Sequence, residues 1–364
     1  MSRRFKLVLG LVALQALALV VVLGVTYWAS QDLLLRFSES FAARVSRDAT
    51  AFTVGFLEPA NETAEISQRM IETGILDPND RMEMQRYFLE LLSVRDNFDG
   101  IYLGEDTGGF VYASRAADGE LGKLRIKKIA TEPNRQVALE WFTPDLELVD
   151  TRLENEDDYD PRERPWYKAA RDGTGPVWTP PYIFFTSQTP GITVSVPVNF
   201  GAEESSTGAI GVDIKIEELS GFLQSLDISP RGQAAIVAEN GDIIAHSVPE
   251  LAAGTAGGSA FNTVENGSDP ILMQAAAQID GGLDTLFPGE IRLSRFDAGG
   301  EVWIGAVLRL ELARTPWTVV TYLPEADILA PLHRVRNIAL VVSMIALFAT
   351  AVLGFIYGRR VMGN

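Results

Sequence analysis

A segment near the middle of the chain combines residues whose chemistry suits binding of a small polar molecule. Arg164, Trp166 and Tyr167 occur in the run Arg-Pro-Trp-Tyr, and Asp213 follows in a separate apolar stretch. A guanidinium is a planar fork of donors that matches a carboxylate, and aromatic faces attract an ammonium group. We therefore expect a pocket in which Arg164 anchors a negative or strongly polar group and Asp213 accepts from an amine or a hydroxyl.

The stretch that carries Asp213 alternates as a half-buried β-strand does. The residues that would face one side are Ile210, Val212, Ile214 and Ile216, and those that would face the other are Ala209, Gly211, Asp213 and Lys215. Small residues beside an acid suit a concave surface, so we expect room for a ligand above this part of the strand.

Each of these residues also has a purely structural explanation. Trp166 and Tyr167 could belong to a hydrophobic core, Arg164 could pair with one of the acids close to it in sequence, and Asp213 could lie on a solvated face. The residues alone leave these alternatives open.

Composition excludes several kinds of chemistry. The chain has no cysteine, which excludes thiol catalysis, disulfides and Cys-ligated metals, and a histidine site would have to use His246 or His333. The formal net charge of −17 repels phosphate backbones, so we expect no nucleic-acid partner. Serine-hydrolase, zinc-protease and phosphate-loop motifs are missing from the sequence. We expect no catalytic residue, no metal and no cofactor; the alternative is a membrane-anchored extracytoplasmic enzyme of hydrolase type.

Two uncharged apolar runs predict membrane helices. Residues 7–31 and 337–358 contain no charge, and at about 1.5 Å per residue each run is long enough for a bilayer core. Basic residues stand before the first run and after the second, so both ends should be cytoplasmic. Residues 29–336 would then lie in the periplasm or outside the cell, and the bilayer of the inner (cytoplasmic) membrane is an expected partner. A cleaved signal peptide is the alternative for the first run.

A long amphipathic helix should follow the first run. Apolar residues recur every three or four positions from Leu34 to Phe56. Pro59 should kink or interrupt the helix, which would resume and then stop at Gly74. This helix could be an ordinary packing helix, or it could be a stalk that passes motion to the membrane and pairs with its copy in a dimer. A second helix is expected over residues 81–92.

Strand patterns then occur twice along the chain. Their first appearance is at 100–104, 109–113, 191–196 and 208–216, with a polar loop at 201–207 and a helix at 217–226. The pattern recurs more compactly at 233–238, 242–246, 302–307 and 316–322. Residues 325–332 begin the helix that enters the second apolar run. We therefore predict two antiparallel-sheet units produced by an internal duplication.

Three short elements, taken together, resemble the double Cache (dCache) family of extracytoplasmic sensors of bacterial receptors. They are Arg-Pro-Trp-Tyr at 164–167, Trp-Thr-Pro-Pro-Tyr at 178–182 and Gly-Ala-Ile-Gly-Val-Asp at 208–213. The resemblance implies an α+β fold in which a long N-terminal helix and two PAS-like antiparallel-sheet modules lie between two transmembrane helices. It also implies a homodimeric, ligand-sensing receptor whose second membrane helix signals to a cytoplasmic output module. The outputs found in the family are class III nucleotide cyclase, diguanylate cyclase, histidine kinase and chemoreceptor modules, and we expect this output to be absent from the present chain.

The resemblance also implies a set of ligand-binding residues. In amino-acid-sensing members, the corresponding positions hold the ligand, and here they are Tyr159, Arg164, Trp166, Tyr167, Tyr182 and Asp213. Phe184 departs from the pattern, because those members carry an acid two residues after the tyrosine. Since one of the two carboxylates that would hold an α-ammonium is missing, the expected ligand is an amino-acid-like, carboxylate or amine metabolite rather than specifically a plain α-amino acid.

The chain is therefore expected to divide into seven segments, with the ligand in the membrane-distal module and the proximal module acting as a spacer. The segments are a cytoplasmic N-terminus at 1–6, a first transmembrane helix at 7–28, a stalk helix at 29–76, a distal module at 77–225, a proximal module at 226–336, a second transmembrane helix at 337–358 and the start of a cytoplasmic linker at 359–364.

Overall fold

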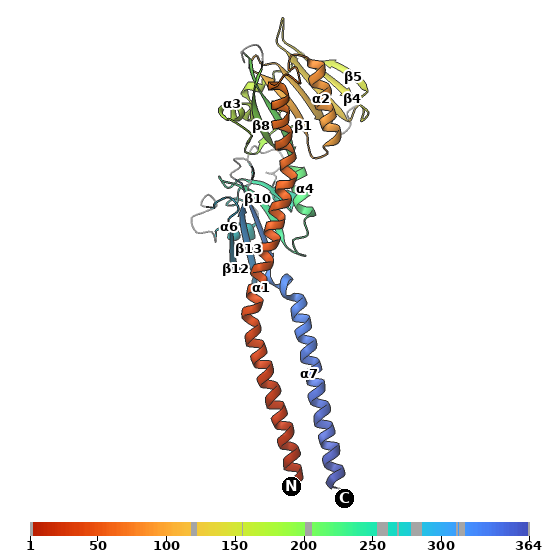
Figure 1. The fold of residues 1–364 in the computed structure, drawn as a ribbon, viewed down its shortest axis with the longest axis vertical. Coiled ribbons are helices and arrows are strands. Elements are labelled where there is room, and N and C mark those ends of the chain that lie inside the picture. Colours follow the sequence, from red (N-terminus) through yellow and green to blue (C-terminus); the bar gives the residue numbers. More distant parts are fainter. Residues whose placement is uncertain are drawn as a thin grey trace.

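The computed structural model shows two antiparallel-sheet units stacked along one long helix (Figure 1). It describes residues 3–117, 122–154, 156–200, 206–252, 261–267, 269–277, 286–310, 312 and 317–362, and for parts of the two terminal helices it describes the backbone alone. Most of the polar loop expected at 201–207 lies outside the described residues, as do the outermost residues of the two expected tails. The α+β class with a long N-terminal helix and antiparallel sheets is confirmed.

Helix α1 (Arg3–Glu72) runs through Pro59, so of the expected kink or interruption the interruption is wrong and the kink stays a prediction. Proline removes one backbone donor from a helix, and the hydroxyl of Thr63, which donates to the Pro59 carbonyl at 2.6 Å, does not replace it. Leu57 and Ala60, on either side of the proline, are fully buried in the main apolar core. Tertiary packing of this face therefore outweighs the local cost of the proline.

The first sheet contains nine strands within the described residues, in the order β5-β4-β3-β2-β1-β9-β8-β6, with β7 paired to β8. The bounds are β1 Gly100–Glu105, β2 Phe110–Arg115, β3 Leu124–Ala130, β4 Gln136–Phe142, β5 Leu148–Leu153, β6 Val177–Trp178, β7 Tyr182–Ile183, β8 Pro190–Phe200 and β9 Ser206–Lys215. Strands β3 to β5 were not expected. Their pattern is obscured by charge, since Lys127 lies inside β3 and is buried, while β5 is an exposed edge strand.

Helices cover both faces of this sheet. The helices are α2 (Arg81–Val94), the short 3₁₀ helix η1 (Pro161–Glu163), α3 (Pro165–Asp172) and α4 (Ile216–Ser225). On one face, apolar residues of β8 and β9 join α1, α2 and α4 in the main core. On the other face, Trp166 of α3 packs with Tyr102 and Ala209 of the sheet. The alternation along β9 thus follows the expected pattern.

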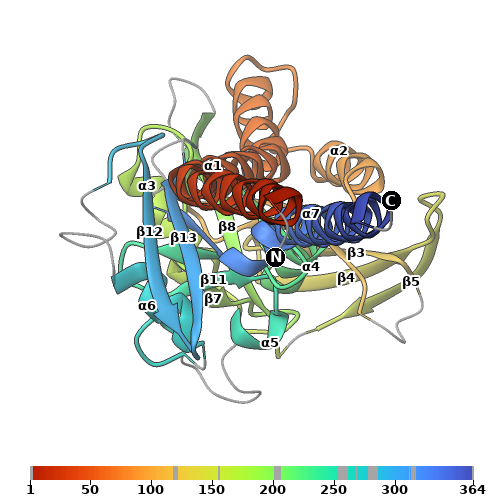
Figure 2. The same ribbon diagram turned by 90° about the horizontal axis from the view of Figure 1, so that it is seen from below.

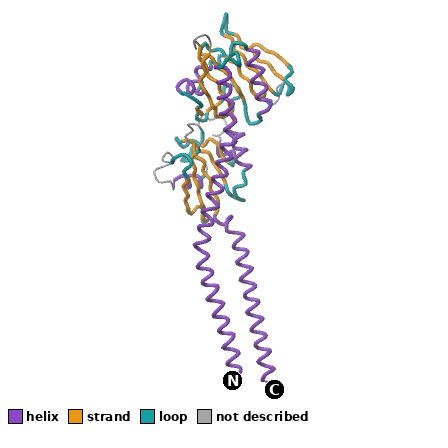
Figure 3. Tube along the Cα trace, in the orientation of Figure 1, coloured by secondary structure: helices purple, strands orange, loops and turns teal. Residues whose placement is uncertain are grey.

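The second sheet contains five strands of the described chain, in the order β11-β10-β14-β13-β12. The bounds are β10 Gln233–Ala238, β11 Ile243–His246, β12 Ile291–Ala298, β13 Glu301–Arg309 and β14 Trp317–Pro324, with helices α5 (Pro249–Ala252) and α6 (Pro270–Ala277) between β11 and β12. The first four strands in this order, β11-β10-β14-β13, correspond to β2-β1-β9-β8 in the first sheet. The strands form two separate groups along α1 (Figure 3).

The last strand of the second sheet leads directly into α7 (Glu325–Met362), which contacts α1. Both helices extend away from the sheets, and the two chain ends lie at the same end of the molecule (Figure 1). The view from below also shows α1 and α7 next to each other (Figure 2). Within the described part of the chain, no helix is both long enough and apolar enough to cross a membrane. The spans expected at 7–28 and 337–358 stay predictions.

Packing of α1 against the sheets can be tested with a matched pair of substitutions on this helix. Leu57 is 0% exposed, whereas Ile66 is 55% exposed. We expect Leu57→Ala to lower the free energy of unfolding by about 2–5 kcal/mol and Ile66→Ala to lower it by less than about 1 kcal/mol. The measurement is denaturant unfolding of the full chain in detergent. Equal losses in the two variants would contradict the burial of Leu57.

Candidate ligand-binding site

A small recess opens on the face of the first sheet that lies opposite α1. Its cavity volume is about 20 Å³, room for about one water molecule, so a larger ligand requires the walls to move apart. Its lining consists of Tyr102, Phe110, Tyr112, Tyr159, Arg164, Trp166, Tyr182, Phe184, Phe185, Thr186 and Asp213. Strands β1, β2 and β9, the segment leading into α3 and the β7–β8 connection therefore all contribute to it.

Asp213 lies at the base of the recess and is 4% exposed. On β9 it is paired with Gly100 of β1 and Thr193 of β8. Its Oδ1 accepts hydrogen bonds from the hydroxyls of Tyr102 and Thr193, both at 2.6 Å. The Tyr182 hydroxyl lies 2.7 Å from that of Thr193. Oδ2 makes no hydrogen bond within the described residues, which leaves it available to a ligand.

Burial controls the charge of Asp213. Loss of solvation raises the pKa of its carboxyl to about 8, although the hydrogen bonds from Thr193 and Tyr102 act in the opposite direction. The group is therefore largely protonated at pH 7. Because Oδ1 accepts both hydroxyls, the proton belongs on Oδ2, where it can be donated to a ligand oxygen. A solvated face for Asp213, one of the alternatives left open by the sequence, is wrong.

Arg164 supplies the positive charge of the recess. It stands between η1 and α3, and its Nη2 donates to the carbonyl of Ile183 at 3.1 Å. The rings of Tyr159, Tyr182 and Phe185 have centroids 6.0, 5.7 and 5.7 Å from its guanidinium carbon. Within the described residues, no carboxylate forms an ion pair with it.

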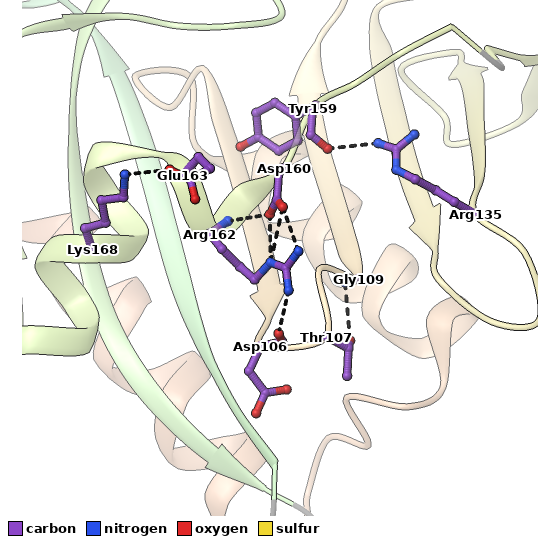
Figure 4. Close-up of polar contacts among 9 residues, drawn as sticks. All are labelled: Asp106, Thr107, Gly109, Arg135, Tyr159, Asp160, Arg162, Glu163 and Lys168. Carbon is purple, nitrogen blue, oxygen red and sulfur yellow. Dashed lines mark hydrogen bonds and ion pairs between the residues drawn. The ribbon is translucent and has the colours of Figure 1, made fainter.

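The acids next to Arg164 in the sequence have other partners. Asp160 pairs with Arg162 at 2.7 Å, and Glu163 pairs with Lys168 at 2.9 Å, as Figure 4 shows. Arg162 also donates to the carbonyl of Asp106, which fixes this loop against the first hairpin. The alternative in which Arg164 is neutralised by a local acid is therefore wrong.

Aromatic rings form the walls. The ring of Trp166 is 4.6 Å from that of Tyr102, and the ring of Tyr159 is 4.9 Å from that of Phe110. A hydrogen bond to β8 fixes the backbone at Trp166, because the hydroxyl of Ser195 donates to its carbonyl at 2.8 Å. The space above Gly211 is filled by the ring of Tyr102, whose Cε2 would lie 2.2 Å from an added Cβ. The expectation of open room at Gly211 is thus wrong, and the recess lies beyond this ring.

Phe184 gives one wall an apolar character. Its side chain is 3% exposed and packs edge-on against Tyr182, with ring centroids 5.3 Å apart. A Cβ added to Gly191 would lie 1.9 Å from Cζ of this ring. The family pattern suggested an acid at position 184. The ring of Phe184 is there instead, and Gly191 of β8 leaves room for it.

The structure brings most of the predicted ligand-binding residues together. Those that line the recess are Tyr159, Arg164, Trp166, Tyr182 and Asp213. Tyr167 is not part of the lining; it packs against the outer side of Trp166, with ring centroids 5.5 Å apart. Sequence reasoning missed Tyr102, Phe110, Tyr112, Phe185 and Thr186. A usable signal was present in Gly100 and Gly211, because glycine inside a strand often marks close approach of another group.

A second cation stands behind the aromatic wall. Lys127 is 1% exposed and forms an ion pair with Asp157, and its Nζ lies 4.6 Å from the centroid of the Tyr159 ring. Desolvation lowers the pKa of Lys127, and its hydrogen bond to Asp157 acts in the opposite direction.

Among the residues that the structure describes, no group of three or more acidic or histidine side chains could hold a metal ion.

The buried acid makes a pH-dependent stability measurable. The unfolded chain loses the Asp213 proton near pH 4, and the folded chain keeps it up to about pH 8. The folded state binds the extra proton between these values, so the contribution of Asp213 to stability falls as pH rises from about 4 to about 8. We expect Asp213→Asn to remove this part of the slope in melting temperature against pH. Glu163→Gln, at an exposed ion pair, is the control; if both variants keep the slope of the parent, Asp213 ionises normally.

The sequence is similar to known proteins along much of its length. A sequence profile of the family described as Cache domain matches residues 39–332. The methyl-accepting chemotaxis protein PscA of Pseudomonas syringae pv. tomato is 36% identical over 94 residues, which are 26% of this chain and 15% of that protein. McpC of Bacillus subtilis is 23% identical over 294 residues, which are 80% of this chain and 39% of that protein. The chain therefore matches only a minor part of the length of these relatives.

Solved structures show the same fold. The ligand-binding domain of the Pseudomonas aeruginosa PAO1 chemoreceptor PctB, in complex with L-Arg, superposes with a TM-score of 0.52 at 17% identity and covers 82% of this chain and 92% of its own. The ligand-binding domain of Mlp24 with asparagine gives a TM-score of 0.50 at 18% identity, with 82% and 97% coverage. From the profile match over most of its length, together with two sheets of matching strand order behind one long helix, the chain belongs to the double Cache domain family.

Proposed function

We propose that the chain is the ligand-sensing, extracytoplasmic part of a bacterial transmembrane receptor, and that the recess on the first sheet binds a small carboxylate. The observation that carries the proposal is the state of Arg164. Its guanidinium faces an aromatic recess, holds a single backbone carbonyl and has no carboxylate partner within the described residues. A ligand carboxylate would supply the bidentate partner for which the guanidinium fork is suited.

The second polar group favours the same chemistry. At neutral pH the protonated Asp213 is a donor, so it complements an oxygen of the ligand better than an ammonium. Phe184 adds an apolar wall and no second carboxylate. An amino-acid-like or amine ligand is the second candidate, because structures with this fold were solved with L-Arg, L-Gln and asparagine. Such a ligand would have to ionise Asp213 on binding.

A route from the recess towards α7 supports the signalling part of the proposal. Thr193, next to Asp213, exchanges hydrogen bonds with Thr179. One residue before Thr179, Trp178 lies against Trp317 at the start of β14, with ring centroids 5.5 Å apart. Strand β14 runs into α7, so a ligand that repositions β8 can move the start of that helix. Small shifts of packed elements are the usual output of such sensors.

The membrane arrangement is also part of the proposal. The uncharged runs at 7–28 and 337–358, with basic residues at both chain ends, support two spans and a region at 29–336 outside the cytoplasm. A homodimer is included, because α1 exposes Phe37, Phe52 and Ile66 on its outer surface. The output is a cytoplasmic module of one of the four kinds named above. The matched relatives are chemotaxis proteins, and the coding sequence after Asn364 would identify the module.

The ligand site can be tested by binding measurements. Matched pairs of small carboxylates and their α-amino derivatives are screened by calorimetry against the full chain in detergent. We expect Arg164→Ala to weaken binding of the best carboxylate by about thirtyfold or more, because a buried charged contact is lost. Arg171→Ala, which removes an exposed arginine near the end of α3, should leave the affinity unchanged. If Arg164→Ala and Asp213→Ala both bind as tightly as the parent, or if a structure places the ligand in the second sheet unit alone, the site is elsewhere.

Membrane topology is tested with protease added to spheroplasts that express the chain. We expect cleavage within residues 29–336, while a cytoplasmic marker protein stays intact. After the membrane is opened with detergent, the marker should be cleaved as well. Protection of residues 29–336 in spheroplasts whose other extracytoplasmic proteins are digested would contradict the two-span arrangement.

A further inference from the structure

The two sheets place different residues at matching backbone positions. Asp213 stands three residues before α4, and Tyr322 stands three residues before α7. Asp213 is paired with Gly100, the first residue of β1, while Tyr322 is paired with Gln233, the first residue of β10. Position by position, Tyr322 is therefore the counterpart of Asp213 on the central strand of the second sheet.

The register extends this match to the neighbouring hairpin strand. Tyr112 of β2 lies opposite Tyr102, which is two residues after Gly100. In the second sheet, His246 of β11 lies opposite Ala235, which is two residues after Gln233. His246 is thus the counterpart of Tyr112, a residue that lines the recess of the first sheet. In both sheets these positions face away from α1.

A carboxylate of the chain itself lies over this part of the second sheet. The hydroxyl of Tyr322 donates to Oδ2 of Asp269, and Nε2 of His246 lies 2.7 Å from the same hydroxyl and 3.5 Å from Oδ2. His246 and Tyr322 are 0% exposed, and Asp269 is 8% exposed. Asp269 does not belong to the sheet, because it directly precedes α6.

The direction of the hydrogen bonds can be assigned. The amide of Val248 donates to Nδ1 of His246 at 2.9 Å, so the neutral imidazole carries its proton on Nε2. Nε2 then donates to the Tyr322 oxygen. The Tyr322 hydroxyl lies 2.9 Å from Oε1 of Gln233 as well, and its single proton is assigned to the shorter contact, with the carboxylate of Asp269. Burial alone would raise the pKa of Asp269, but the polar groups around it, which are His246, Tyr322 and the amides of Ile271 and Leu272, outweigh this and lower the pKa to about 2. The group is a carboxylate at every physiological pH.

Helix capping accounts for only one oxygen of this carboxylate. Oδ1 of Asp269 accepts from the amides of Ile271 and Leu272 at 2.8 and 3.1 Å, which is the usual bonding of an N-cap. Oδ2 makes no contribution to the cap and is held by the Tyr322–His246 pair. A serine or asparagine would cap α6 without needing these two buried donors.

We propose that the second sheet contains a carboxylate-binding site, built by Tyr322 and His246, which the chain fills with its own Asp269. The site stands where the first sheet has its ligand recess, and Asp269 acts there as a tethered ligand that fixes α6 to the sheet. With the Asp269 side chain removed, the site takes a free small carboxylate, and it does not take the uncharged amide of the same shape.

The test is chemical rescue of Asp269→Gly in the full chain in detergent. Glycine still suits an N-cap, and acetate matches the atoms that the substitution removes. We expect the variant to melt below the parent and about 100 mM sodium acetate at neutral pH to raise its melting temperature by about 3–6 °C relative to sodium chloride at equal ionic strength. Acetamide should have no such effect. The parent and Asp269→Asn, whose side chains fill the site, should not respond to acetate.

Two further variants make the outcome decisive. Asp269→Ala keeps the β-carbon, so formate should stabilise it more than acetate does, the reverse of the order for Asp269→Gly. Adding Tyr322→Phe to Asp269→Gly should abolish the acetate response, because the main donor is lost. The proposal is overturned if acetate stabilises neither Asp269→Gly nor Asp269→Ala. It is also overturned if acetate stabilises the parent and the double variant Asp269→Gly/Tyr322→Phe equally.

Discussion

The structure depends on one continuous apolar core that joins both sheets to α1. Leu57 of α1, Ile210 of the first sheet and Val319 of the second belong to the same buried cluster, and α4 adds Leu219 and Leu223 between the sheets. Because burial of apolar area is the dominant stabilising term in folding, this core fixes both sheets to one rigid helix. The recess and the Asp269 cluster both lie on the opposite face of each sheet.

The two polar sites lie at matching backbone positions, but the carboxyl in one is protonated and the carboxyl in the other is ionised. In the first sheet the acid belongs to the strand, is held by Thr193 and Tyr102 and keeps its proton. In the second sheet the strand supplies the donors, and the acid arrives from α6 with enough hydrogen bonds to remain ionised. Desolvation raises the pKa of both carboxyls and acts more strongly on the deeper Asp213, while the additional polar groups around Asp269 lower its pKa.

Periodicity was sufficient to predict the elements whose residues alternate cleanly. The hairpin that starts at Gly100, the strand of Asp213 and the helix over 217–226 were predicted close to their observed bounds. It failed where tertiary packing overrides local signals: Pro59 remains helical because its neighbours are buried, and β3 carries a lysine whose partner, Asp157, is distant in sequence. Five of the eleven residues that line the recess were predicted from the family resemblance, and Tyr102 and Phe110 are among those that were missed. Their role depends on which strand pairs with β9, and a single sequence does not contain that pairing explicitly.

The close approach between Phe184 and Gly191 has a consequence for how such a pocket can diverge. The ring at 184, just after β7, occupies the space that any side chain at 191 on β8 would need, so the two positions are constrained to change together. An acid introduced at 184 alone would leave a gap above Gly191, and a larger residue at 191 alone would expel the ring. The chemistry of this wall therefore depends on both residues. A change from an aromatic to an acidic residue at 184 passes through a single substitution that packs poorly, unless position 191 changes as well.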